Sequence, residues 1–390
     1  MNKPVYDFDY QRDPRIAAFG HGAWEALKRE APPVFWTEAN GGHWVANTSR
    51  SVIEVLQHPD RFSSKVLTIP PDLNAPKMIP IMLDPPEHRA FRQLLRPWFE
   101  SKAIEHLEPR VAEWTEQLIA DLTDEGECEF VEALASRLPV SVFMEMFGFP
   151  LERFDDFRGL VVQFFNARVS NEERGGLAMQ IMGLIGETIA LRKAQPGDDI
   201  LSQLLSADFE GRKLDQGELM SICFLMFLAG LDTVTNAMTF GMRHLARDEA
   251  LRQRMIDDPD CIPKAVEELM RRYAFVATPR YIVKDTELEG VQLRAGECIL
   301  APLMMVGWDA ELQSCPEQVT LDRPTCKHAG FGSGIHTCLG IHLARLELIS
   351  FYRIWFRRIG HFHEIDTGEP PHFRPGSVMT LEKLHLRWSR

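Results

Sequence analysis

The 390-residue sequence has no segment that predicts membrane insertion or export. Its longest apolar run, residues 222–231, is far short of the ~20 residues that a membrane-spanning helix needs. The opening residues, Met1-Asn2-Lys3-Pro4, lack the pattern of a signal peptide. We therefore expect a cytoplasmic protein that does not bind a membrane.

Paired cysteines, an excess of basic residues and internal repeats are missing as well. Seven cysteines, an odd number without a C-x-x-C spacing, argue against a disulfide framework and against a zinc site. The net charge of −13 argues against nucleic acid as a partner, because phosphate binding relies on clustered lysine and arginine. No repeat or low-complexity segment indicates a linker between domains.

What is present is a large globular chain, 45% hydrophobic and 25% charged, which can bury a substantial core. From about residue 90 to 250 the apolar residues recur at helical spacing. Strand signals are found elsewhere, at residues 45–51, 280–283 and 291–300, with Gly290 and Gly296 as turn residues. We predict a mainly α fold with small β-sheets.

The order of these elements bears on domains and cofactors. Strands and helices do not alternate regularly, which argues against a doubly wound dinucleotide-binding fold and so against a flavin or NAD site in this chain. We expect residues 1–390 to form a single domain, with β-rich regions near 30–60, 280–302 and 360–390.

One glycine-rich loop, residues 331–340 (FGSGIHTCLG), carries a single cysteine and precedes a long helical segment. A backbone without Cβ can adopt positive φ angles and can approach a flat, bulky group closely. Cys338 would project from this loop into the positive field of the following helix, where unpaired amides favour thiolate over thiol. A thiolate held there is a suitable axial ligand for haem iron.

Three other interpretations of this loop remain open. A phosphate-binding loop is weakly indicated, because the G-x-G-x-x-G spacing is not completed at Gly332 and no lysine follows as in a Walker loop. A cysteine hydrolase would need its thiol activated by a histidine, and His336 is close in sequence. A buried structural cysteine in a turn is the usual role of a lone cysteine.

A second segment predicts a helix that is capped at Asp215, with Glu218 three residues later, and that continues to about Leu245. Near its middle, Asp232 and Thr233 interrupt an apolar stretch. A hydroxyl can hydrogen-bond bound oxygen and a carboxylate can relay protons from solvent. Alternatively, Asp232 lies on a solvated face and the Thr233 hydroxyl bonds back to the carbonyl one turn earlier.

Two residue pairs also follow helical spacing. Glu268 and Arg271 lie at i, i+3 on one helical face, an arrangement that in isolation is common surface decoration. His88 and Arg92 lie at i, i+4, so that both can reach one anionic group.

The 331–340 loop resembles the haem-binding signature of the cytochrome P-450 family, and the resemblance runs from about Asp84 to the C-terminus. The matching loop positions are Phe331, Gly332, Gly334, His336, Cys338 and Gly340. The matching positions in the long helix are Ala229, Gly230, Asp232 and Thr233. The resemblance implies a mainly helical fold with haem b (iron protoporphyrin IX) between the Asp232–Thr233 helix and the helix after Cys338.

The resemblance also implies roles for the site residues. Cys338 would be the axial ligand of the haem iron, and Asp232 and Thr233 would guide protons to bound dioxygen. Contacts to the haem would come from His88, Arg92, Arg280, Phe331, Gly332, His336 and Gly340. Close relatives can carry an acid where Thr278 stands. Glu268, Arg271 and Arg323 would form a structural triad on the cysteine side of the haem.

The nearest resemblance is to bacterial terpenoid hydroxylases of the camphor-hydroxylase type. It implies an O2-dependent monooxygenase that hydroxylates an unactivated C–H bond, with electrons from a two-iron ferredoxin and its reductase. An apolar cavity fits a small substrate such as a monoterpenoid or norisoprenoid. The expected pocket residues are Leu67, Met78, Leu225, Leu228, Ala229, Val276 and Val378. The expected cations for docking a ferredoxin are Arg89, Arg92, Lys327, His342 and Arg345.

Three alternative functions remain. A peroxide-driven peroxygenase would keep the haem loop but would not need Asp232 and Thr233. A haem sensor would bind carbon monoxide without oxidising a substrate. A cysteine hydrolase would be colourless and would be alkylated at Cys338.

Overall fold

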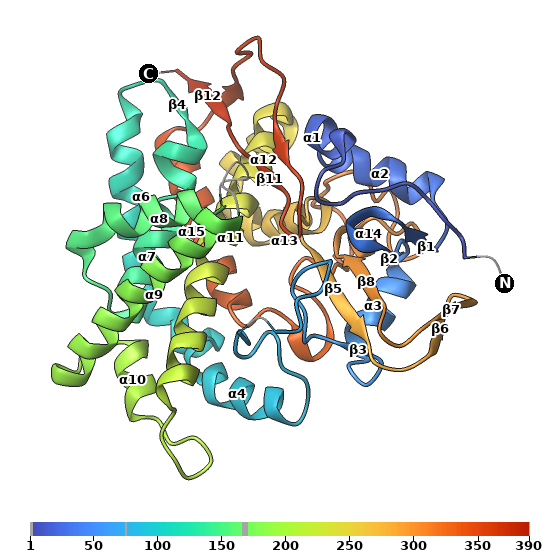
Figure 1. Ribbon diagram of the computed structural model, residues 1–390. Coiled ribbons are helices and arrows are strands. Elements are labelled where there is room, and N and C mark those ends of the chain that lie inside the picture. The colour runs from blue at the N-terminus through green and yellow to red at the C-terminus, as the bar shows by residue number, and fades with distance from the viewer. Residues whose placement is uncertain (1–2, 75, 166–170, 390) are drawn as a thin grey trace.

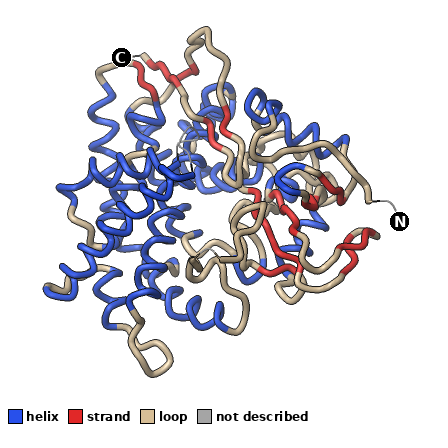
Figure 2. The backbone as a smooth tube through the Cα atoms, in the orientation of Figure 1, coloured by secondary structure: helices blue, strands red, loops and turns tan. Residues whose placement is uncertain are grey.

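The computed structural model describes residues 3–74, 76–165 and 171–389. Helices make up the left side of the molecule in Figure 1, whereas most of the short strands and their connecting loops make up the right side (Figures 1 and 2). This arrangement confirms the predicted mainly α fold with small β-sheets.

The long helix α11, Gln216–Arg247, organises the helical side. The Asp215 side chain accepts a hydrogen bond from the Glu218 amide, and the Glu218 carboxylate accepts one from the Asp215 amide, so the predicted helix and its capping box are confirmed. Within the described ranges α11 is the one helix long and apolar enough to cross a membrane. Here it contacts helices α7 (Leu138–Phe147), α9 (Asn171–Ala194), α13 (Ile262–Arg272) and α15 (Ile341–Arg358).

The principal sheet has five strands in the order β1-β2-β8-β5-β3. Strand β2 pairs in parallel with β8, and the other neighbours are antiparallel. The strand predicted over residues 45–51 is wrong in its second half, because β2 ends at Ala46 and a helix begins at Ser49. Thr48 caps that helix and exchanges hydrogen bonds with Ser51, so capping chemistry ends the strand early.

The remaining strands form small sheets. Strands β4, β12 and β9 form a three-stranded sheet in that order, and β6–β7 and β10–β11 are two-stranded. The strands are β1 (Val34–Thr37), β2 (His43–Ala46), β3 (Phe62–Ser63), β4 (Glu127–Glu129), β5 (Ala277–Ile282), β6 (Thr286–Leu288), β7 (Val291–Leu293), β8 (Cys298–Pro302), β9 (Phe362–Glu364), β10 (Phe373–Arg374), β11 (Thr380–Leu381) and β12 (His385–Trp388).

The helices other than α11 surround it or cover the sheet. They are α1 (Pro14–Phe19), α2 (His21–Glu30), α3 (Ser49–Gln57), α4 (Glu87–Leu95), α5 (Ser101–Ile104), α6 (Glu108–Thr123), α7 (Leu138–Phe147), α8 (Phe154–Phe165), α9 (Asn171–Ala194), α10 (Ile200–Ser206), α12 (Glu249–Asp257), α13 (Ile262–Arg272), α14 (Met304–Gly307) and α15 (Ile341–Arg358).

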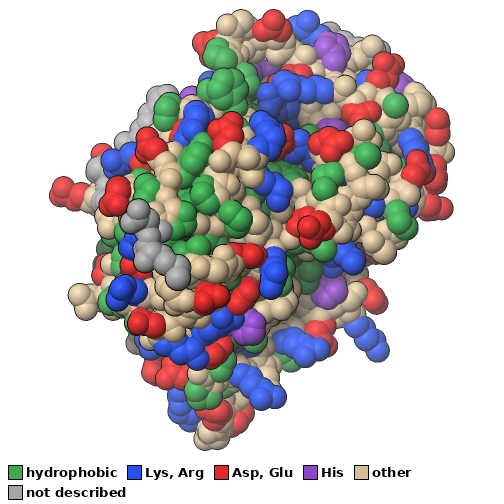
Figure 3. Space-filling view, turned by 90° about the vertical axis from the view of Figure 1, so that its right-hand side faces the viewer, with side chains coloured by type: hydrophobic (Ala, Val, Ile, Leu, Met, Phe, Trp, Pro, Cys, Tyr) green, Lys and Arg blue, Asp and Glu red, His purple; other side chains and the backbone are tan. Residues whose placement is uncertain are grey.

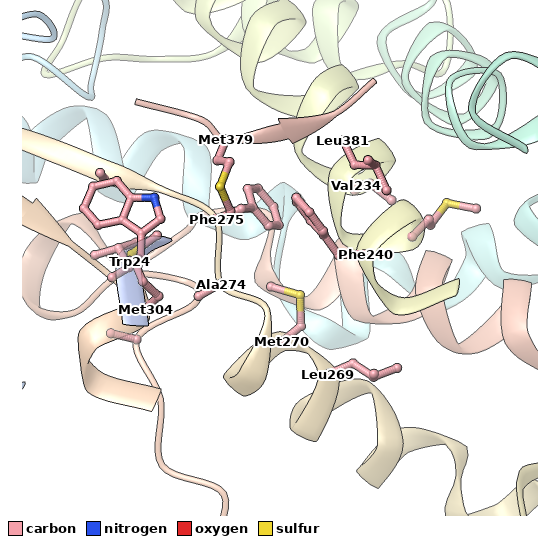
Figure 4. Close-up of a cluster of buried hydrophobic side chains, with 14 of the residues drawn as sticks. Trp24, Val234, Phe240, Leu269, Met270, Ala274, Phe275, Met304, Met379 and Leu381 are labelled. Atoms are coloured by element: carbon pink, nitrogen blue, oxygen red, sulfur yellow. The ribbon is translucent and has the colours of Figure 1, made fainter. Parts of the chain in front are cut away.

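Buried aromatic and aliphatic side chains join the two sides of the molecule. Figure 4 shows Phe240 of α11 facing Phe275, which lies between α13 and β5, with Met379 on one side of the pair and Met270 on the other. The two rings are stacked with their centroids 6.0 Å apart. Dispersion and burial at this contact fix α11 against the segment that leads into the sheet.

The strand-rich side is seen face-on in Figure 3. Acidic and basic side chains are interspersed over most of this face, while hydrophobic side chains gather in one broad area. Charges of both signs therefore alternate over the surface that the figure draws.

Candidate functional site

A cavity of about 310 Å³ lies between α11, α4 and the loop 331–340, called here the Cys338 loop. It gathers side chains from distant parts of the chain, because Thr233 comes from the middle of α11 and Arg280 from β5. All of the expected haem-contacting residues line it, namely His88, Arg92, Arg280, Phe331, Gly332, His336, Cys338 and Gly340.

A backbone hydrogen bond closes the Cys338 loop, since the Cys338 amide donates to the Phe331 carbonyl oxygen at 2.8 Å. Gly332 and Gly334 have φ angles of 78° and 73°, in the region that favours glycine. A Cβ on Gly334 would lie 2.7 Å from the carbonyl oxygen of Leu56. Glycine is therefore required where the loop approaches α3.

The Cys338 side chain is exposed to the cavity although protein surrounds it. Burial raises the pKa of this thiol, while the Gly340 amide, Arg92 and Arg345 act in the opposite direction. The Gly340 amide lowers the pKa of Cys338, as predicted for the backbone that follows the cysteine. Without a bound cofactor, however, the effect of burial is larger and the thiol form is favoured. A coordinated metal ion would shift this balance, because metal binding deprotonates a thiol.

Two arginines line the cavity, and both donate hydrogen bonds to neutral groups. Arg92 Nη2 donates to the Thr337 carbonyl oxygen at 2.8 Å, and Arg280 Nη1 donates to Thr278 Oγ1 and to the Pro279 carbonyl oxygen at the same distance. In the described part of the chain, neither arginine forms a salt bridge. Burial lowers the pKa of Arg280 to about 10, although the Asp84 carboxylate acts in the opposite direction.

Two histidines lie beside these arginines, with the ring centroids of His88 and His336 4.1 Å apart. Burial and the neighbouring arginines lower the pKa of His88 to about 4 and that of His336 to about 3. The Nε2 atoms of both rings are buried and have no hydrogen-bond partner within residues 3–74, 76–165 and 171–389. Two arginines and two histidines thus surround a place suited to an anionic group.

These residues fit a haem. Its two propionates would supply the negative charge that Arg92 and Arg280 lack. The Cys338 thiol would face the flat surface of the macrocycle, and the space over Gly340 is open, because a Cβ there would meet no atom within 4 Å. The donor set of a thiol, two arginines and two histidines therefore agrees with the cofactor that the sequence motifs imply.

Asp232 and Thr233 lie at different depths. Asp232 is not on a solvated face, because its Oδ2 is buried, lies 3.9 Å from Arg374 Nη2 and has no hydrogen-bond partner in the part of the chain that the structure describes. Burial raises the pKa of Asp232, whereas Arg374 and Asn236 lower it. Thr233 lines the cavity, and its hydroxyl donates to the Ala229 carbonyl oxygen at 2.8 Å, as the alternative interpretation predicted.

The three residues of the expected structural triad meet in the interior. Arg323 Nε donates to Glu268 Oε1 at 2.7 Å, and Arg271 Nη2 donates to Glu268 Oε2 at 3.1 Å. Both arginines also donate to backbone carbonyl oxygens, including that of Gln318. Glu268 and Arg271 are fully buried, so this pair is not surface decoration.

The expected pocket residues divide into two groups. Leu225, Ala229 and Val276 line the cavity. The others are partly buried and do not line it, namely Leu67, Met78, Leu228 and Val378.

An apolar wall and one acid of the cavity were not predicted from the sequence. The wall consists of Phe99 together with Phe143, Met146 and Phe147 of α7. Because α7 is apolar at nearly every position apart from Glu145, its sequence predicts a core helix and does not indicate which face lines a cavity. The acid is Glu347 of α15, where burial raises the pKa to about 8; its signal was a carboxylate between leucines.

The expected docking cations are not all available to a partner. Arg92 faces the cavity, and Arg345 forms a bidentate pair with Glu267 at 2.6 and 2.8 Å. The exposed ones are Arg89, Lys327 and His342.

Comparisons with known proteins agree with this site. A family model described as Cytochrome P-450 matches residues 260–383. The probable cytochrome P-450 127A1 of Sinorhizobium fredii is 32% identical over 375 residues, which are 95% of this chain and 90% of that protein. The crystal structures of CYP101J2 and CYP101C1 have TM-scores of 0.91 and 0.93 and identities of 35% and 33%. They cover 99% and 100% of this chain, and 97% and 98% of those chains.

The fold and the site therefore define a haem monooxygenase. The chain belongs to the cytochrome P-450 family, as its motifs predicted.

Proposed function

We propose that this protein is a haem-thiolate monooxygenase that hydroxylates an unactivated C–H bond of a small apolar substrate. Haem b, when bound, activates dioxygen for insertion of one oxygen atom into that bond. The observation that carries the proposal is the convergence of the Cys338 thiol, the arginines Arg92 and Arg280, and the Thr233 hydroxyl on one cavity.

In this proposal the residues around the cavity hold the cofactor. Cys338 would bind the haem iron through its sulfur. His88, Arg92, Arg280 and His336 would bind the propionates; the two arginines donate only to neutral groups among the described residues, and both histidines have a buried Nε2 without a hydrogen-bond partner there. Thr278 contributes by orienting Arg280, whose guanidinium is within electrostatic range of Asp84 but forms no salt bridge with it among the described residues.

Thr233 and Asp232 hold and move protons. The Thr233 hydroxyl leaves the Ala229 carbonyl by a rotation about χ1 and then donates into the cavity. Asp232 is suited to pass on a proton, because burial raises the pKa of its carboxyl and its Oδ2 has no hydrogen-bond partner. Arg374, at 3.9 Å, stabilises the carboxylate after it has given up that proton.

The substrate is proposed to be a monoterpenoid or norisoprenoid. Phe143, Leu225 and Val276 give the cavity an apolar lining, which suits a hydrocarbon-like ligand. Arg92 and Arg280 are assigned to the propionates, so a carboxylate substrate would lack a fixed cation.

The electrons are proposed to come from a two-iron ferredoxin and its reductase. The protein is proposed to act in the cytoplasm and to fold as one domain over residues 1–390. Arg89, Lys327 and His342 are the exposed cations for docking an acidic partner. Because exposed charge pairs are screened by salt, ferredoxin-supported turnover should fall as ionic strength rises. Turnover that is independent of salt, or supported by peroxide alone, would contradict this partner.

The test of the proposed function is the reduced, carbon-monoxide-bound spectrum of the purified protein. A thiolate ligand shifts the Soret band far to the red of a haem with a histidine or thiol ligand. We expect the red-shifted band in the native protein and its loss in Cys338→Ser. A colourless protein, or an unshifted band, would overturn the proposal.

A further inference from the structure

One carboxylate on α13 binds side chains from both sides of Cys338 in the sequence. Glu267 accepts hydrogen bonds from Arg345 Nε at 2.6 Å and from Arg345 Nη2 at 2.8 Å. Its Oε2 also lies 3.2 Å from His328 Nε2. Since His328 precedes the Cys338 loop and Arg345 follows it, Glu267 connects the two ends of the segment that carries the cysteine.

The histidine arm has a defined hydrogen-bond direction. The Gly330 amide donates to His328 Nδ1 at 3.1 Å, so this nitrogen is an acceptor and the ring hydrogen is on Nε2. His328 Nε2 therefore donates to Glu267, and the side chain is only 6% exposed. This arm holds the backbone directly before Phe331 against α13.

The arginine arm reaches Cys338 through Phe331. The Arg345 guanidinium lies 5.2 Å from the centroid of the Phe331 ring, a cation–π distance. Phe331 lines the cavity, and its carbonyl oxygen accepts the hydrogen bond of the Cys338 amide at 2.8 Å. Each step from Glu267 to the cysteine backbone is thus a direct contact.

The geometry points to Glu267 as a positioning residue that fixes the Cys338 thiol towards the cavity by holding both ends of its loop. Its neighbour Glu268 has a different task, because it binds Arg271 and Arg323 and not the loop. The inference rests on the proposed function, in which Cys338 is the axial ligand. It predicts that loss of the Glu267 charge loosens thiolate ligation and does not simply weaken the fold.

The test is Glu267→Gln in the haem-loaded protein. The readouts are the rate at which the reduced, carbon-monoxide-bound protein loses its red-shifted band in a mild denaturant, and the reduction potential of the iron. We expect band loss to be about tenfold faster, because a charge-assisted bidentate pair is replaced by weaker hydrogen bonds. We also expect a changed potential, because hydrogen bonding around a ligating sulfur tunes it.

Glu364→Gln is the matched control. Glu364 also binds two arginines, Arg243 at 3.3 Å and Arg247 at 2.5 Å, but it lies on β9 and does not line the cavity. This variant should keep the wild-type band-loss rate and potential. Arg345→Lys keeps the positive charge but loses the planar guanidinium, so it should change the band-loss rate and the potential in the same direction as Glu267→Gln does. It replaces Glu267→Gln in the test if Glu267→Gln does not fold.

The outcomes separate the two proposals. A wild-type protein without the red-shifted band would overturn the proposed function. A wild-type protein with the band, in which Glu267→Gln and Arg345→Lys match Glu364→Gln in both readouts, would overturn the role of Glu267 and leave the function intact. Faster band loss in Glu267→Gln and Arg345→Lys but not in Glu364→Gln, with similar unfolding temperatures for all three variants, would support the positioning role.

Discussion

Buried carboxylates are treated differently on α13 and on the helices α11 and α15 that line the cavity. On α13, Glu267 and Glu268 accept hydrogen bonds from arginine at both carboxylate oxygens. On α11 and α15, Asp232 and Glu347 each have one buried oxygen without a hydrogen-bond partner among the described residues, and the nearest cation to that oxygen of Asp232 is Arg374, with Nη2 at 3.9 Å. A paired carboxylate maintains a fold, whereas an unpaired one costs free energy. Asp232, with only a long contact to Arg374 and next to the cavity-lining Thr233, and Glu347, which lines the cavity itself, therefore indicate chemistry and not architecture.

The largest expected effect comes from breaking the paired side with Glu268→Gln. Removing this charge leaves Arg271 and Arg323 buried without a counter-charge. We expect the free energy of unfolding to fall by about 3–5 kcal/mol, measured by urea unfolding. Glu116→Gln is the control, because Glu116 pairs with exposed arginines and should change stability by less than about 1 kcal/mol. Equal effects of the two variants would contradict the comparison.

Glu347→Gln tests the unpaired side through pH. Burial raises the pKa of Glu347 to about 8 from its ordinary value of 4.5, so its contribution to stability is lost as the pH rises through that range. At pH 7 the cost is about 3 kcal/mol, because each pKa unit corresponds to ~1.4 kcal/mol.

The neutral glutamine of Glu347→Gln should therefore leave the free energy of unfolding unchanged near pH 4 and raise it by up to about 3 kcal/mol at pH 7. Urea unfolding of wild type and variant at several pH values checks this. A difference that is constant with pH would show that Glu347 does not titrate between its ordinary value and 8.

Asp232→Asn should separate stability from activity. Because burial raises the pKa of Asp232, its ionised form destabilises the fold as the pH rises, so the neutral asparagine should not lower the unfolding temperature at pH 7. Loss of the proton carrier should lower kcat roughly 100-fold. A variant with full kcat and an unchanged solvent isotope effect would place the proton path elsewhere.

Thr233→Ala is expected to have the smallest effect on the fold. Among the described residues its hydroxyl bonds only to the Ala229 carbonyl oxygen of its own helix, so the unfolding free energy should change by less than about 1 kcal/mol. The fraction of electrons that ends in hydroxylated product should nevertheless fall, with peroxide formed in its place. Product and peroxide measured per NAD(P)H consumed would show it, and unchanged coupling would remove Thr233 from the relay.

The sequence predicted those parts of the site whose residues form local patterns. Glycine spacing located the Cys338 loop, and the cap at Asp215 located the start of α11, because both depend on neighbouring residues. Residues 45–51 show the limit of composition alone. Valine and threonine favour strands, but the hydrogen bonds of Thr48 and Ser51 start a helix there.

Contacts between distant segments could not be predicted in this way. Arg374 lies 142 positions after Asp232 (374 − 232), and no local pattern indicates that they meet. Glu267 and Glu268 look alike in sequence, yet only the arrangement of α13 and α15 shows which one reaches Arg345. The apolar wall on α7 was hidden for the same reason, since its phenylalanines resemble any core residues.

The consecutive glutamates of α13 also limit how this family member can change. Successive residues of an α-helix are turned by about 100°, so Glu267 and Glu268 face two different partners from adjacent positions. Insertion or deletion of one residue earlier in α13 would rotate both carboxylates at once, and neither could be restored by a single substitution. Both carboxylates therefore depend on the same rotation of α13 about its axis. The length of α13 should be among the least variable features of the fold.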